Sequence, residues 1–367
     1  MRVRIEHLTA FTYGQPAAAS FTEVRLTPRN DEHQNLLDFT LQTDPPARTT
    51  AYRDHFGTLV HAFNVTAPHR ALSVVGSSVV VTYPRPQPPR EPPGAATLDA
   101  LEDPVLRDAQ AEWLHRSPRA SGGEHLYAFA QHVRRVVSAQ TVVDLVYGVA
   151  AEVHGRFAYS PGTSYVSSTV DDLLERGTGV CQDFAHLTIA TLRDLGVPAR
   201  YVSGYFYAGP AEAVRLDEPL AVESHAWVEA LIPGWGWLEV DPTNDCPADE
   251  RHVTVAVGRD YADVAPVRGT RRGGSGAVMT VRVTMVAPSA EVARRVAPLA
   301  VLGPAGAVAS SRSGHRVPAG VPRRVPVSVT AEHAAALGQV GAPGAADVLA
   351  TGPAQGYDDG RAAQQQQ

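Results

Sequence analysis

Cysteine is scarce in this sequence, which has only Cys181 and Cys246 among 367 residues. Two cysteines far apart provide neither a disulfide framework nor a CxxC metal motif. Reduced thiols are typical of the cytoplasm, which is therefore the expected compartment. We expect no cofactor and no metal.

Long hydrophobic runs and an excess of positive charge are also missing. No apolar run approaches the roughly 20 residues that span a bilayer. The N-terminal stretch MRVRIEHLTAFTY alternates apolar and polar residues, unlike the continuous apolar segment of a signal peptide. The net charge of −6 gives no general attraction to nucleic acid or anionic lipid. We therefore expect neither a nucleic-acid nor a membrane partner, and the oligomeric state stays open.

The patterns that are present predict an α+β protein with two folded parts. Residues 1–84 contain short runs of period two broken by Pro, Asn, Asp and Gly, which predict an antiparallel β-sandwich. Prolines over 85–96 predict a stiff linker. Residues 97–287 begin with helical spacing and end in strands, and the strand over 277–286 is expected to close this second domain. Residues 288–367 are rich in Ala, Gly and Pro and predict a disordered tail.

Cys181 stands where a glycine-containing loop, GTGV, turns into a helix-like pattern. The helix is predicted from apolar and small residues that share one face, and Gly196 and Pro198 are expected to end it. Unpaired backbone N–H groups and the dipole at a helix start favour a thiolate, and they can also hold an oxyanion. The alternative is that Cys181 is a small buried hydrophobe, as free cysteines often are.

A base for such a thiol is available in the segment SHAWVEALIPGWGWLEVDPTN. The segment predicts a β-hairpin around Ile232–Gly236, in which Leu231 pairs with Trp237 if the loop has five residues. His225 and Asp241 then lie diagonally on one face, close enough for a hydrogen bond. A loop of even length would separate them. Taken alone, His225 could be a half-buried strand residue and Asp241 could simply begin a turn.

Several ordered stretches resemble the transglutaminase-like superfamily of papain-like cysteine enzymes, and in particular its bacterial branch with an N-terminal β domain. The stretches are GVCQDFAH, GVPARYVSGY, SHAWVE, GWLEVDPTN and VGRDYADVAPVRG, and the resemblance covers roughly residues 1–287. It implies a papain-like core of a helical subdomain and an antiparallel sheet. It also implies that Cys181 is the nucleophile, His225 the general base and acid, and Asp241 the residue that orients His225.

The resemblance leaves other residues of these stretches less defined. Gln182 and Trp227 are candidates for oxyanion or substrate contact, although hairpin packing is the alternative for Trp227. Asp183 is expected to bond the backbone at the helix start. His186 lies about 140° around the helix from Cys181 and should support the site without facing the thiol. Cys246 could lie near the cleft, where a disulfide to Cys181 would silence the enzyme.

Together, these residues predict acyl transfer through a thioester on a peptide or glutamine-type amide of a peptide or protein substrate. Water as acceptor gives a cysteine peptidase or amidase, which we expect ahead of crosslinking to an amine. Two alternatives come from other classes. One is a catalytically silent binding module with the same fold, and the other is a metal protein that uses Cys181, Cys246, His225 and His186, which no spacing supports.

Overall fold

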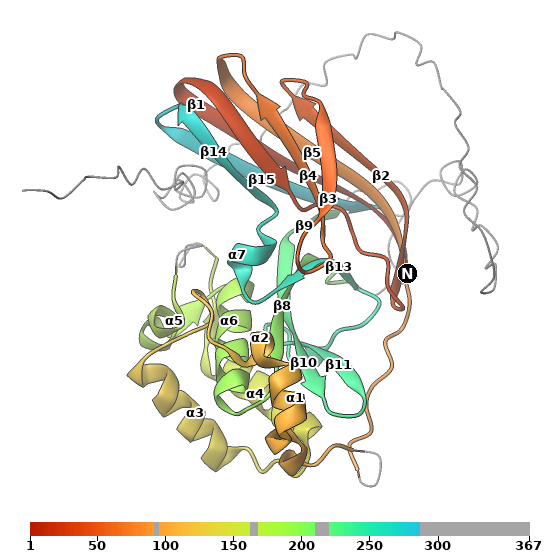
Figure 1. Cartoon of the computed structure of the whole chain (residues 1–367), viewed down its shortest axis with the longest axis vertical. Coiled ribbons are helices and arrows are strands. Elements are labelled where there is room, and N and C mark those ends of the chain that lie inside the picture. Colours follow the sequence, from red (N-terminus) through yellow and green to blue (C-terminus); the bar gives the residue numbers. More distant parts are fainter. Residues whose placement is uncertain (92–94, 162–167, 210–219, 287–367) are drawn as a thin grey trace, which may run out of the picture.

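The computed structural model describes residues 1–91, 95–161, 168–209 and 220–286. Figure 1 shows a curled antiparallel sheet and, beside it, a group of helices packed against a second sheet. The tail expected over 288–367 lies outside the described residues. None of the described helices is long and apolar enough to cross a membrane.

The first sheet is organised around one very long strand, β1 (Arg2–Val24). Its first half pairs with β5 (His69–Thr82) and β15 (Ala277–Val286). Its second half pairs with β4 (Leu59–Val65) and β14 (Val267–Gly273). The register of β1 shifts between the two halves, as a β-bulge does when it bends a strand. β1 therefore belongs to both halves of one curled sheet.

Three shorter strands extend this sheet. They are β2 (Gln34–Asp44) beside β5, β3 (Thr49–Arg53) beside β4, and β9 (Leu220–Val222) beside β15. Inward-facing residues of both halves form one apolar cluster, as the alternating pattern of β1 requires. Its members include Phe11, Tyr13, Val24, Leu26, Phe63, Val65, Leu72 and Val74.

The prediction that a last strand closes the second domain was wrong. The strand forms, as β15, but it pairs with β1 from Arg4 to Tyr13. A period-two pattern identifies a strand without identifying its partner, so this long-range pairing left no local signal. The first sheet therefore takes strands from both ends of the described chain.

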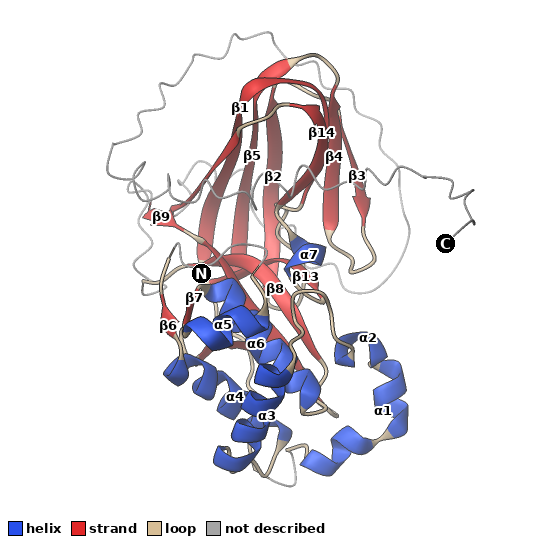
Figure 2. Ribbon diagram, turned by 90° about the vertical axis from the view of Figure 1, so that its left-hand side faces the viewer, coloured by secondary structure: helices blue, strands red, loops and turns tan. Residues whose placement is uncertain are grey.

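Most helices belong to the second part, below the first sheet in the view of Figure 2. Thr141 and Thr169 each begin a helix with a capping box, in which a threonine and an aspartate three residues later satisfy each other's backbone N–H. The elements before the site are η1 (Leu98–Glu102), α1 (Pro104–Ala109), α2 (Ala111–Leu114), α3 (Glu124–Val136), α4 (Val142–Arg156), β6 (Ala158–Tyr159), α5 (Val170–Arg176) and β7 (Thr178–Gly179).

Helix α6 (Cys181–Asp194) packs between these helices and the second sheet. The sequence predicted one apolar face, but every residue from Gln182 to Arg193 is buried, because α3, α4, α5, β8 and β10 surround the helix. The second sheet has the order β12-β11-β10-β8-β13. Its strands are β8 (Ala199–Phe206), β10 (Ser224–Ile232), β11 (Gly236–Asp241), β12 (Cys246–Pro247) and β13 (His252–Gly258), and the short helix α7 (Tyr261–Val264) follows.

Candidate active site

The loop before Cys181 is built for close packing. Gly177 ends α5 with a φ of 72°, a left-handed conformation that favours glycine. Gly179 lies so close to Asp183 and Leu173 that an added Cβ would come within 2.8 Å of the carboxylate and 2.9 Å of the leucine. Cys181 is then the first residue of α6, which confirms the helix start predicted from the sequence.

The first turn of α6 leaves two backbone donors available. The buried Asp183 carboxylate accepts from the N–H of Val180 at 2.8 Å, which is the backbone role expected for Asp183. The N–H groups of Asp183 and Phe184 donate to the carbonyl of Val180. Within the described ranges, no acceptor faces the N–H groups of Cys181 or Gln182. These two donors at a helix start can hold a developing oxyanion.

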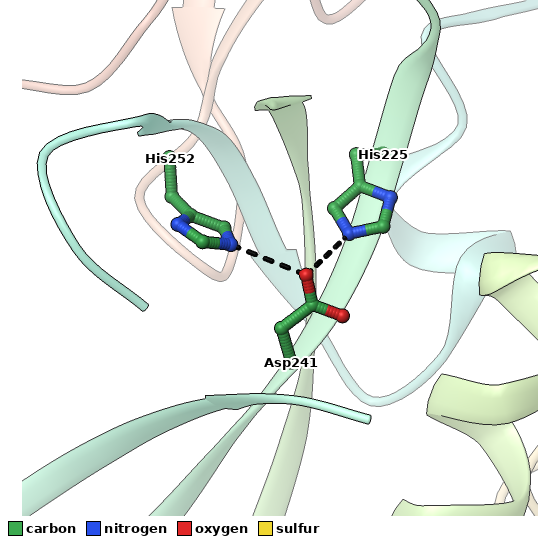
Figure 3. A group of neighbouring side chains, drawn as sticks. All are labelled: His225, Asp241 and His252. Atoms are coloured by element: carbon green, nitrogen blue, oxygen red, sulfur yellow. Dashed lines mark hydrogen bonds and ion pairs between the residues drawn. The ribbon is translucent and has the colours of Figure 1, made fainter. Parts of the chain in front are cut away.

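The β10–β11 hairpin has the predicted register. Leu231 pairs with Trp237, and the same register puts His225 and Asp241 on one face. The Nε2–H of His225 donates to Oδ2 of Asp241 at 2.8 Å (Figure 3). Because Nε2 is engaged, Nδ1 is the ring nitrogen left for the thiol, and Cys181 is close enough to interact electrostatically with this ring.

The environment of His225 favours the charged ring. Burial opposes the charge, but the hydrogen bonds and negative charges of Asp241 and Cys181 outweigh burial and raise the pKa of His225 to about 10. Burial likewise opposes ionisation of Asp241, whereas hydrogen bonds from His225 and His252 hold the pKa of this carboxyl well below its usual range. At neutral pH the pair is therefore an imidazolium beside a carboxylate.

A second histidine on Asp241 was missed by the sequence analysis. His252, fully buried at the start of β13, lies with Nε2 at 3.3 Å from Oδ2 of Asp241, opposite His225 (Figure 3). β13 reaches this place by pairing with β8, which also pairs with β10. The contact depends on the order of four strands, β11-β10-β8-β13, so spacing in the sequence gave no signal for it.

His225, Asp241 and His252 are also a set of side chains that could hold a metal ion, because their ligand atoms all lie within 4.8 Å of one another. However, Oδ2 of Asp241 already accepts hydrogen bonds from both histidines and from the Asn244 amide at 2.6 Å. Oδ1 accepts the backbone N–H groups of Thr243 and Asn244. The donor set is therefore explained by hydrogen bonding, and it fits a metal poorly.

Comparison with known proteins identifies the family of this chain. Residues 128–242 match the transglutaminase-like superfamily, and residues 3–81 match the bacterial transglutaminase-like N-terminal region. The uncharacterized protein ML0607 of Mycobacterium leprae is 37% identical over 289 residues, which is 78% of this chain and 99% of that protein. The chain belongs to the transglutaminase-like superfamily.

Two further similar proteins are more distant. A Pseudomonas aeruginosa protein-glutamine gamma-glutamyltransferase is 31% identical over 140 residues, which is 37% of this chain and 20% of that protein. A solved structure from Cytophaga hutchinsonii, presented as a candidate cysteine protease, has 22% identity and a TM-score of 0.60 over 78% of this chain and 90% of its own. That likeness shows the fold.

The remaining predicted residues lie around the site in different roles. Trp227 is fully buried, and its indole N–H donates to Glu239 at 2.7 Å, so the structure gives it packing contacts and no open face for substrate. Gln182 is also largely buried. His186 accepts from the N–H of Tyr261 at 3.1 Å, and burial lowers the pKa of His186 to about 3, so the ring is neutral and supports α7.

The second cysteine lies on the strand next to the acid. Cys246 pairs across from Asp241, and both Cys246 and Cys181 are free thiols. Burial, together with the charges of Asp241 and Asp249, raises the pKa of Cys246 to about 11. Cys246 is therefore a neutral thiol at physiological pH.

Two further residues were missed at the mouth of the site. Tyr159, in β6 opposite Gly179, is 46% exposed, and its hydroxyl donates to the exposed carboxylate of Glu223 at 3.4 Å. Burial first, and then the charges of Cys181 and Glu223, raise the pKa of Tyr159. The phenol of Tyr159 therefore lies near the thiol, because Tyr159 pairs with Gly179, two residues before Cys181. Its partner Glu223 lies two residues before His225 in the sequence.

Proposed function

We propose that this member of the transglutaminase-like superfamily catalyses thiol-dependent acyl transfer on peptide or glutamine-type amides, with water as the main acceptor. Cys181 is the nucleophile, His225 the general acid and base, and Asp241 the residue that orients His225. The observation that carries the proposal is the hydrogen bond of His225 to the buried carboxylate of Asp241, together with a thiol at a helix start whose charge acts on the same ring.

The first half-reaction follows from the charges. An imidazolium beside Cys181 stabilises the thiolate, which attacks the amide carbonyl. The oxyanion forms next to the N–H groups of Cys181 and Gln182, which face no acceptor in the described part of the chain. His225 then gives its proton to the leaving nitrogen, the C–N bond breaks, and a thioester remains on Cys181. Asp241 stays ionised throughout, because its pKa is low.

The second half-reaction reverses these roles. Neutral His225 takes a proton from water, the oxygen attacks the thioester, and the acid product leaves as the thiolate and imidazolium are restored. An amine that takes the place of water forms a new amide instead. The name of the Pseudomonas aeruginosa relative favours this amine route as a second candidate.

One feature of the composition makes the two outcomes easy to separate. All 32 basic residues are arginine, so the chain has no lysine of its own to act as acceptor. An amide formed with a lysine side chain must therefore take that amine from another molecule, such as the added amine or a second peptide.

The test is to trap the acyl group. Wild-type protein is incubated with a peptide library in ¹⁸O-water, with and without a small primary amine. The masses of the protein and of the peptides are then measured by mass spectrometry. We expect a thioester on Cys181 and ¹⁸O in the product acid, and neither in Cys181→Ala. Product that contains amine and no ¹⁸O would favour crosslinking. A wild-type protein that forms no adduct and no product would favour the silent binding module.

A further inference from the structure

We propose that His252 is a positioning residue that holds Asp241 in place, and that the N-terminal sheet serves the active site by fixing the strand that carries His252. This inference rests on the proposed function, since it concerns the acid of the same site. It gives the N-terminal region a role in catalysis besides any role in substrate recognition.

The tautomer of His252 follows from its two partners. The backbone N–H of Asp249 donates to Nδ1 at 3.1 Å, so Nδ1 is the acceptor and Nε2 carries the proton. That proton points at Oδ2 of Asp241, 3.3 Å from Nε2. The Oδ1 atom of Asp249 also lies 3.3 Å from Nδ1. The Nε2–H of His252 can therefore donate to Asp241 in a fixed direction.

Aromatic packing keeps the ring in this orientation. The centroid of Phe206 is 4.6 Å from that of His252, and Trp227 meets the ring edge-on at 5.2 Å. Both aromatic residues also flank His225, at 5.3 and 6.1 Å. Asp241 is thus held between two histidines that share the same two aromatic neighbours.

Side chains of the N-terminal sheet hydrogen-bond to the backbone around His252. The fully buried side chain of Gln34, at the start of β2, donates to the carbonyl of Thr254 at 2.7 Å and accepts the N–H of Thr254 at 2.7 Å. The Gln34 amide therefore makes the pair of backbone hydrogen bonds that a residue of a neighbouring strand would make. It does so where the pairing of β13 with β8 shifts register. From β5, the Thr82 hydroxyl donates to the carbonyl of Glu250 at 2.5 Å.

A residue of the linker makes a third contact with this backbone. Arg85 follows β5 with a side chain only 5% exposed and donates to the carbonyl of His252 at 3.0 Å. It also forms an ion pair with Glu239, the residue that accepts from the indole of Trp227. Contacts from β2, β5 and the linker therefore converge on residues 250–254 and on the tryptophan beside the two histidines.

Two substitutions of His252 separate positioning from mere packing. His252→Gln places an amide nitrogen near the position of Nε2 and keeps a donor for Asp241. His252→Asn replaces the Nδ1 side and is too short to reach Asp241. Each is compared with wild type and with His225→Ala by the rate at which iodoacetamide alkylates Cys181 at about pH 6, a probe that needs no substrate.

We expect His252→Asn to slow alkylation by about tenfold or more, which matches a hydrogen bond to a charged group worth ~1.4 kcal/mol or more. His252→Gln should stay within about threefold of wild type. Equal alkylation rates for wild type and His252→Asn would overturn the proposal. It would also be overturned if both variants slowed alkylation equally and the slowing simply followed their loss in melting temperature.

Gln34 tests the role of the N-terminal sheet with His252 intact. Gln34→Ala should slow alkylation by a similar factor, whereas Gln42→Ala, at an exposed position of the same strand, should not. Gln34→Ala combined with His252→Asn should be no slower than His252→Asn alone, because both act through one contact. Additive effects, or a wild-type rate for Gln34→Ala, would refute the link. A wild type that alkylates no faster than His225→Ala would instead contradict the proposed function itself.

Discussion

Replacing Asp241 with asparagine tests how much the carboxylate contributes to the reactive thiol. The substitution keeps the size of a fully buried side chain that accepts five hydrogen bonds, but it removes the charge. A hydrogen bond to a charged group contributes about 1.5–3 kcal/mol, so the imidazolium at His225 should be weakened by ~10- to 150-fold. Less imidazolium means less stabilisation of the thiolate, and alkylation of Cys181 at about pH 6 should slow by that factor.

The assay is the iodoacetamide rate at Cys181, read by mass spectrometry. Asp245→Asn is the matched control, because it makes the same chemical change four residues away at an exposed position. Its φ of 48° is one that asparagine tolerates. If Asp241→Asn and Asp245→Asn both react at the wild-type rate, the carboxylate does not support the thiol and the reasoning is wrong.

Three further predictions concern the residues around the thiol. Gly179→Ala should lower the free energy of unfolding by about 1–3 kcal/mol, because the added Cβ would overlap Asp183 and Leu173 before α6. Gly155→Ala is the control, since its Cβ meets nothing within 4 Å and the variant should be neutral or more stable. Equal melting temperatures for the two variants would contradict this. Cys181→Ser should lose nearly all turnover with the trapped peptide, and turnover that recovers at high pH would show that another group attacks. Glu223→Gln should slow turnover of cationic peptides more than that of neutral ones, because it removes a negative charge that would attract them. An equal effect on both kinds of peptide would show that Glu223 does not contribute to substrate selection.

The sequence predicted the parts of the site that depend on local spacing. The helix start at Cys181 follows from the glycines before it and the apolar pattern after it. The alignment of His225 with Asp241 follows from the parity of one hairpin loop, and the observed pairing of Leu231 with Trp237 agrees with it.

The parts that were missed depend on contacts between distant strands. His252 reaches Asp241 because β13 and β10 both pair with β8, and periodicity does not encode the order of strands in a sheet. The same limit explains why β15 was expected in the wrong sheet. The support from Gln34 requires the two parts of the chain to be packed together, 220 residues apart in sequence.

The most direct test of the central claim is the alkylation rate of Cys181 as a function of pH, in wild type and in His225→Ala. Cys246 is an internal reference, since its pKa is raised to about 11 and it should react slowly over the same range. A raised pKa of about 10 for His225 means that the imidazolium is present below that pH and is lost above it. We therefore predict that wild-type Cys181 reacts rapidly at about pH 6 and that His225→Ala loses this reactivity. A wild-type rate that rises only near pH 8.5, as for an ordinary free thiol, and that is unchanged in His225→Ala would contradict the account.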